Sequence, residues 1–138
     1  MNWLAWALLS ALFAALTAIL AKVGVANINP NLATAIRTTV VLLFTWSIVF
    51  FTGGKIDWSD TDPRAWLFLV ASGLATGLSW LCYFRALKLG EVAKVAPVDK
   101  LSVAIAIILA VTVLGEKIKP REALGAGLIV LGVIVMVI

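Results

Sequence analysis

Five apolar segments, each long enough to cross a bilayer, occupy almost the whole of this 138-residue chain. A helix needs roughly 20 apolar residues to cross about 30 Å of hydrocarbon. Apolar runs of this length do not alternate with polar residues, so they predict helices rather than a transmembrane β-barrel. The sequence therefore predicts an all-α, polytopic membrane protein with a single five-helix domain over residues 1–138. The expected spans are 3–25, 32–52, 64–88, 92–114 and 121–138.

The composition agrees with a membrane protein and excludes an ordinary soluble domain. Hydrophobic residues make up 63% of the chain, and the mean hydropathy is +1.11, which is outside the usual globular range. The first span has no basic segment before it and is too long for a cleaved signal peptide, so we expect it to be retained. Five spans would place the two chain ends on opposite sides of the membrane. Any internal symmetry would then come from a second chain.

Several classes of chemistry are not expected. The chain has a single cysteine, Cys82, and no histidine, so an intrachain disulfide is excluded and the commonest metal ligand and proton shuttle are missing. No pair of carboxylates lies at membrane depth, and the acidic loop with Asp57, Asp60 and Asp62 is expected to be solvated. We therefore predict no enzyme activity, no cofactor and no metal. The net charge of +4 comes from basic residues at span ends, which predicts anchoring in the lipid bilayer rather than nucleic-acid binding.

Turn and capping residues mark the helix ends. Asn31 is expected to be the N-cap of the second helix, and Asp62 that of the third, followed by Pro63 at the first helical position. Gly90 suits the end of the third helix. Pro120 is expected to open the last helix.

Tryptophans and glycines indicate how the helices meet lipid and each other. Gly73 and Gly77 form a G-x-x-x-G in the third span, a spacing that allows close helix packing. Four tryptophans lie near predicted interfaces and fit an aromatic belt: Trp3, Trp6, Trp58 and Trp66.

Lysine and arginine are nearly balanced across the membrane. The side of the first and third loops carries six: Lys22, Arg37, Arg85, Lys88, Lys94 and Lys100. The other side carries five: Lys55, Arg64, Lys117, Lys119 and Arg121. The positive-inside rule, which orients a chain by its excess of lysine and arginine on one side, therefore predicts almost no preference for either orientation. One interpretation is that a partner or one decisive charge selects a single orientation. The other is that the chain inserts both ways and forms an antiparallel, dual-topology homodimer. Such a dimer would recreate an inverted repeat.

Charged residues inside the spans are the candidate functional residues. A charge near the bilayer centre costs at least ~2.5–3.5 kcal/mol on insertion scales. Arg37 lies about 8 Å inside the second span, and Asp99 and Lys100 lie about 10–12 Å inside the fourth. Pro97 interrupts the same helix, a pattern expected where irregular backbone lines a cavity. The predicted substrate-binding residues are Arg37, Pro97, Asp99, Lys100, Trp80, Tyr83 and Arg85.

Asp99 has two interpretations. Helical geometry turns Lys100 about 100° away from it, so these neighbours are not expected to neutralise each other. Asp99 is expected to meet Arg37 or Arg85 from another helix. Such a pair could fix the packing of the helices or line a translocation pathway, and the two roles are compatible. Lys22, Arg85, Lys88 and Lys94 also suit interfacial anchoring.

Several short motifs resemble the repeat of the drug/metabolite transporter superfamily, EamA-like branch. They are Ala86-Leu87-Lys88-Leu89-Gly90, Ala96-Pro97, Leu114-Gly115-Glu116, Gly125-Ala126, Leu128-Ile129 and Gly132. The resemblance implies one half of a ten-helix inverted-repeat transporter, completed by a second copy or a similar small protein. It also implies secondary transport of small metabolites by alternating access, in the inner (cytoplasmic) membrane.

One departure from the superfamily bears on the ligand. The four-helix small multidrug branch uses a glutamate in its first helix, whereas the first span here has no acidic residue. The net positive cluster instead favours an anionic or zwitterionic substrate. Two other functions remain open: a small dual-topology channel, and a non-transporting membrane subunit of a hetero-oligomer.

Overall fold

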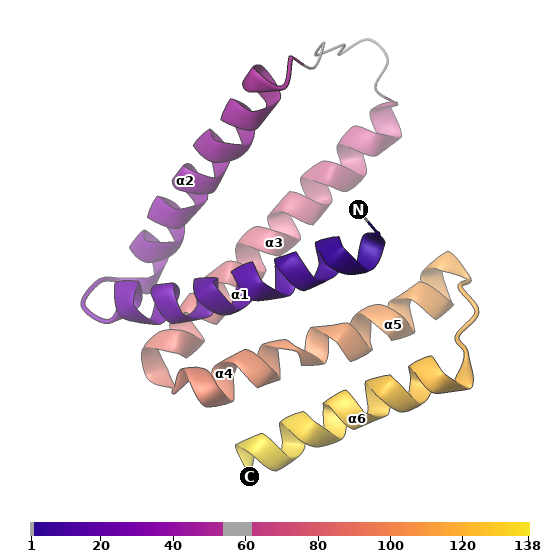
Figure 1. The fold of residues 1–138 in the computed structure, drawn as a ribbon. Coiled ribbons are helices and arrows are strands. Elements are labelled where there is room, and N and C mark those ends of the chain that lie inside the picture. The colour runs from indigo at the N-terminus through magenta and orange to yellow at the C-terminus, as the bar shows by residue number, and fades with distance from the viewer. Residues whose placement is uncertain (1, 54–61) are drawn as a thin grey trace. The chain divides into compact units, whose positions relative to one another are not determined.

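A computed structural model describes residues 2–53 and 62–138 of the chain, and these residues form helices joined by short turns (Figure 1). Five stretches are long and apolar enough to cross a membrane, with the fourth made of two consecutive helices. The prediction of an all-α fold with five membrane-spanning segments is confirmed. The helices are α1 (Trp3–Val25), α2 (Pro30–Phe51), α3 (Pro63–Leu89), α4 (Val92–Asp99), α5 (Leu101–Leu114) and α6 (Pro120–Val137).

The chain divides into two compact units, and each is described by itself. Unit 1 comprises Met1–Ile19 and Leu89–Ile138, and unit 2 comprises Leu20–Lys88. The division therefore falls inside α1 and at the end of α3. A single five-helix domain over residues 1–138 stays a prediction.

Helix α2 begins two residues earlier than its sequence suggests. The N-cap is Asn29, whose side-chain oxygen accepts a hydrogen bond from the backbone N–H of Asn31 at 2.8 Å. The expectation that Asn31 caps this helix is wrong. Pro30 has no N–H to lose and a backbone angle already suited to the first helical position, so the helix starts there.

The other helix ends lie within one residue of the predicted span ends, and the predicted cap at Asp62 and the proline starts of α3 and α6 are confirmed. Asp62 accepts a hydrogen bond from the N–H of Arg64 at 2.9 Å, and α3 starts at Pro63. Helix α5 ends at Gly115, whose φ of 69° is left-handed and suits glycine. Pro120 opens α6, where Glu122 accepts from the N–H of Lys119 at 2.9 Å. The predicted features at Gly54, Lys55, Asp57, Trp58 and Asp60 lie outside the described residues.

The fourth span is broken in its N-terminal half. Helix α4 contains Pro97 and ends at Asp99, and α5 starts at Leu101. Between them, the N–H of Lys100 donates to the Pro97 carbonyl at 2.9 Å, a bond across three residues rather than four. Pro97 cannot donate to the carbonyl four residues earlier, so the regular ladder is interrupted here. The predicted disturbance around Pro97 is therefore present.

The best-packed part of unit 2 surrounds the turn between α1 and α2. Val25 at the end of α1 and Leu87 near the end of α3 are fully buried. Their buried neighbours in the unit come from the same three helix ends: Ala21, Ala33, Thr34 and Phe84. Small residues on α1 and α2 allow the helices to approach closely beside the large side chains of α3.

In unit 1, α4 and α5 both pack against α6, and Figure 1 shows α5 and α6 running side by side. Val133 of α6 is buried in this unit. The short turn after Gly115 explains this arrangement, because a connection of a few residues makes consecutive helices antiparallel neighbours.

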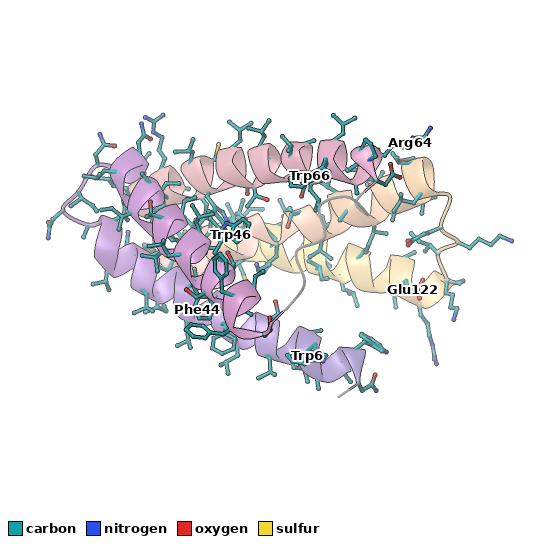
Figure 2. The ribbon with its side chains drawn as sticks, turned by 90° about the horizontal axis from the view of Figure 1, so that it is seen from above. Trp6, Phe44, Trp46, Arg64, Trp66 and Glu122 are labelled. Carbon is teal, nitrogen blue, oxygen red and sulfur yellow. The ribbon has the colours of Figure 1, made fainter. Side chains whose placement is uncertain are left out.

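Most of the apolar surface is not covered by protein. At most 11% of the most apolar window of any span is buried, as expected when lipid is the solvent. Hydroxyl groups on α2 are satisfied locally, because Thr34, Thr38 and Ser47 each donate to the carbonyl four residues earlier. Trp6 and Trp66 lie near the first turns of α1 and α3, at positions suited to a membrane interface (Figure 2).

Candidate substrate-binding site

Arg37 of α2 lies against an aromatic face of α3. Its guanidinium carbon is 4.0 Å from the centroid of the Trp80 ring and 5.8 Å from that of Phe84. Arg37 and Trp80 are half-buried, and Phe84 is 3% exposed. A guanidinium over an aromatic face is attracted by the ring quadrupole, and this attraction grows when water is excluded. Two large rings therefore hold the Arg37 head group in place.

The aromatic face follows from residue spacing on α3. Trp80, Tyr83, Phe84 and Leu87 occur at i, i+3, i+4 and i+7, so they share one side of the helix. Tyr83 also interacts electrostatically with Arg37. The structure thus brings together three predicted site residues, Arg37, Trp80 and Tyr83. It adds Phe84, which the sequence reasoning missed although its spacing from Trp80 could have indicated it.

The guanidinium of Arg37 has no hydrogen-bond acceptor in the part of the chain that the structure describes. Among residues 2–53 and 62–138, no side chain or carbonyl oxygen accepts a hydrogen bond from this guanidinium, and no carboxylate pairs with it. A guanidinium carries five N–H donors and no acceptor. Its donors are therefore available to a ligand, to water or to lipid.

Arg85 is not part of this cluster. It follows Phe84 directly, so it points about 100° around α3 from the aromatic face, and it is exposed. The structure does not bring it to Trp80 or Arg37. Its predicted role in substrate binding stays a prediction, as does an interfacial one.

Two lysines hold together the helix ends next to this cluster. The ammonium group of Lys22 donates to the carbonyl oxygen of Leu87 at 2.6 Å, and that of Lys88 donates to the Ile28 carbonyl at 2.6 Å. The sequence predicts that both lysines anchor helix ends. The structure gives each a specific acceptor: a carbonyl left free at the end of α3, and one in the turn between α1 and α2.

In unit 1, the break in the fourth span carries an ion pair. The Lys100 ammonium is 3.2 Å from a carboxylate oxygen of Asp99, and the two side chains are 54% and 36% exposed. The expectation that these neighbours cannot neutralise each other is wrong. It assumed regular helical spacing, whereas the helix is interrupted at Lys100 and the long lysine side chain reaches back.

The other predicted features of this segment can be placed within unit 1. Pro97 is half-buried on α4, two residues before Asp99. An adjacent, partly exposed ion pair is weak and can open without repacking a core. The expected pairing of Asp99 with Arg37 or Arg85 joins residues of different units and stays a prediction.

The sequence matches a known protein family. The model of the EamA-like transporter family matches residues 1–138. The chain belongs to this family. A similar protein is the "Uncharacterized transporter in cobO 3'region" of a Sinorhizobium species. It is 53% identical over 137 residues, which cover 99% of this chain and 97% of that protein.

A second relative differs in length. The "Uncharacterized transporter YxxF" of Bacillus subtilis (strain 168) is 27% identical over 128 residues, which cover 92% of this chain but 40% of that protein. The relative therefore has room for a second segment of this length. No solved structure matches the chain significantly. The resemblance to EamA-like transporters inferred from the sequence is confirmed, and the chain is a multi-pass membrane protein of a transporter family.

Proposed function

We propose that this EamA-like protein is a secondary transporter of small anionic or zwitterionic metabolites, and that it works by alternating access in the cytoplasmic membrane. The observation that carries the proposal is the placement of charge inside the spans of a transporter-family chain. Arg37 on α2 presents donors that meet no acceptor among residues 2–53 and 62–138, and Asp99 and Lys100 lie at a helix break. Broken helices and charges at membrane depth are typical of substrate sites in transporters.

The transporter works as an antiparallel homodimer of two oppositely inserted copies. The near balance of lysine and arginine supports this assembly, since six lie on one side and five on the other. The length relation to the Bacillus relative supports it too, because this chain matches 40% of that protein. Two copies of a five-span unit would supply the ten spans of an inverted-repeat carrier.

Each residue has a role in this proposal. Arg37 or Lys100 holds the anionic group of the substrate. Asp99 exchanges its pairing with Lys100 for an amine or a proton on the substrate. Pro97 supplies the local bend that allows α4 and α5 to move against each other.

Reporter fusions test the assembly. We expect a C-terminal green fluorescent protein, which fluoresces when folded in the cytoplasm, and a C-terminal alkaline phosphatase, which is active outside it, both to give signals. A signal from one fusion alone would rule out the antiparallel homodimer while leaving transport open.

Uptake into proteoliposomes tests the transport step. We expect saturable uptake of organic anions or zwitterions, reduced in Arg37→Ala, Asp99→Asn and Lys100→Ala. Unchanged uptake in all three variants would remove this site. Flux far above about 10³ per second would indicate a channel. A purified chain that stays monomeric and is not stabilised by any solute would indicate a non-transporting subunit.

A further inference from the structure

The Arg37 cluster consists of Arg37 on α2 and of Trp80, Tyr83 and Phe84 on α3. It combines one basic group with an apolar surface, which is the composition of a site for an organic anion. The guanidinium lies over Trp80 at 4.0 Å and near Phe84 at 5.8 Å, so its position is fixed by ring contacts. These contacts use the π-electrons of the rings, and no described oxygen accepts a hydrogen bond from the guanidinium. A planar fork of donors held in place in this way suits two oxygens of one group.

Among the residues of unit 2 that the structure describes, no acidic side chain lies near Arg37. Among the described residues of this unit, Asp62 is the acidic one, and it lies 18 residues before Trp80 on α3. At 1.5 Å per residue, this separation is about 27 Å along the helix. The other charged side chains described in the unit are basic: Lys22, Arg64, Arg85 and Lys88.

The two neighbouring lysines are each hydrogen-bonded to the backbone. Lys22 and Lys88 donate to the carbonyl oxygens of Leu87 and Ile28, each at 2.6 Å. They add positive potential at this end of the unit while their ammonium groups are engaged with backbone oxygens. The guanidinium of Arg37 is the basic group here whose donors meet no acceptor among the described residues.

We infer that Arg37 binds the oxyanion group of the transported solute, a carboxylate or a phosphate, through two parallel hydrogen bonds, with Trp80 holding the guanidinium. This assignment rests on the proposed transport function and specifies the substrate class at one of its sites. The rings of Trp80 and Phe84 provide an apolar surface next to the anion, so an organic anion with a small apolar body fits better than an inorganic ion. A lipid phosphate has the same head-group chemistry and is the alternative occupant.

Equilibrium binding to the purified chain in an uncharged maltoside detergent tests this inference. The probes share one phenyl body and differ in charge: benzoate and phenyl phosphate as oxyanions, benzamide as the neutral form and benzylammonium as the cation. We expect calorimetry to show saturable binding of the oxyanions, and at least ~10-fold weaker binding of benzamide and benzylammonium. Equal affinity across the series would overturn the assignment.

Variants locate the bound group. Arg37→Gln is expected to weaken oxyanion binding by at least ~10-fold, and Arg37→Lys by less, since it keeps the charge but not the fork. Trp80→Ala is expected to weaken it about 3- to 10-fold, and Trp80→Phe by less. Arg64→Gln is the matched control, because Arg64 lies in the first turn of α3 (Figure 2), far from Trp80 along the helix, and should bind as the parent does. A loss in Arg64→Gln equal to that in Arg37→Gln would contradict a local site.

A lipid arm separates the two sources of the anion. Short-chain dihexanoyl phosphatidylglycerol is titrated in place of the phenyl probes, and then together with them. Benzoate or phenyl phosphate binding that persists at saturating lipid supports a solute site. Arg37-dependent binding of the lipid alone would overturn the assignment to a transported solute.

The same variants distinguish this inference from the proposed function. If Arg37→Gln removes oxyanion binding but no solute is taken up by proteoliposomes of the parent, the site stands and the transporter proposal fails. If the parent takes up solute and Arg37→Gln changes neither binding nor uptake, the transporter proposal stands and the site at Arg37 fails.

Discussion

The ammonium group of Lys22 on α1 is 2.6 Å from the carbonyl oxygen of Leu87 on α3, across 65 residues of sequence. Leu87 is fully buried, and its carbonyl belongs to the last turn of α3, where it has no partner within the helix. Lys88, the next residue, donates in turn to the Ile28 carbonyl between α1 and α2. Two lysines thus connect three helix ends beside the Arg37 cluster.

Replacing Lys22 with methionine is expected to destabilise unit 2. Methionine keeps the apolar stem but cannot donate to the Leu87 carbonyl, and a buried acceptor without a donor is costly. Hydrogen bonds between membrane helices contribute up to ~1–2 kcal/mol. The measurement is the thermal unfolding midpoint in detergent, which should fall.

Lys94→Met is the matched control for that experiment. Lys94 is an exposed lysine on α4, and its side chain makes no hydrogen bond to the described residues. Its removal should leave the midpoint nearly unchanged. Equal effects of the two substitutions would show that general loss of charge, not the contact with Leu87, decides stability.

The spans could be predicted from the sequence because their signals are local. Length and hydropathy set the five segments, and Pro63 and Pro120 mark helix starts through their own backbone geometry. The start of α2 was missed because Asn29-Pro30-Asn31 offers two asparagines as caps, and proline at the first helical position selects Asn29.

The candidate site was only partly predictable. Depth in the span identifies Arg37, and the aromatic face of α3 was predicted at Trp80 and Tyr83. Phe84 was missed although it lies four residues after Trp80 on the same face. The acceptors of Lys22 and Lys88 are backbone carbonyls, which no residue type signals. The pairing of Asp99 with Lys100 was excluded by regular helix geometry, and the break after Pro97 removes that regularity.

Pro97→Ala is expected to stabilise the fourth span and to slow transport. Alanine restores an N–H that can donate to the carbonyl of Ala93, and a helix-interior proline costs up to ~3 kcal/mol relative to alanine. The unfolding midpoint should rise while the uptake rate falls. Pro120→Ala is the control, because a proline at the first helical position lacks no needed donor. Faster uptake in Pro97→Ala would contradict a role for the break in movement.

Exchanging Asp99 and Lys100 separates the two interpretations of their ion pair. The double variant Asp99→Lys/Lys100→Asp keeps an adjacent pair of opposite charges at the helix break, whereas Asp99→Asn leaves Lys100 without its partner. If the pair serves packing, the exchange should restore both stability and uptake. We expect restored stability with uptake still reduced, measured by unfolding midpoints and proteoliposome assays, because in the proposed transport step each charge meets the substrate from its own position.

Gly73 and Gly77 are expected to contribute to the contact between two copies of the chain. A Cβ atom added at either position would meet nothing within 4 Å in this structure, so we expect Gly73→Leu and Gly77→Leu to leave the fold of one chain intact. Close helix packing at a G-x-x-x-G would be blocked by leucine. Chemical crosslinking or light scattering should show less dimer. Gly127→Leu, which also has open space on α6, is the control, and a dimer unaffected by either α3 change would exclude this face.

Under the proposed dual topology, changes of charge near the helix ends should produce two complementary chains that each insert one way. Glu116→Lys with Lys94→Gln makes the side of loops two and four more basic. Glu91→Lys with Lys117→Gln and Lys119→Gln makes the side of loops one and three more basic.

Each variant alone should insert mainly one way, as reporter fusions would show. Each should also transport poorly, because antiparallel pairs cannot form. Co-expression of the two should restore uptake. Full uptake by either variant alone, with its reporter on one side, would show that oppositely oriented copies are not needed.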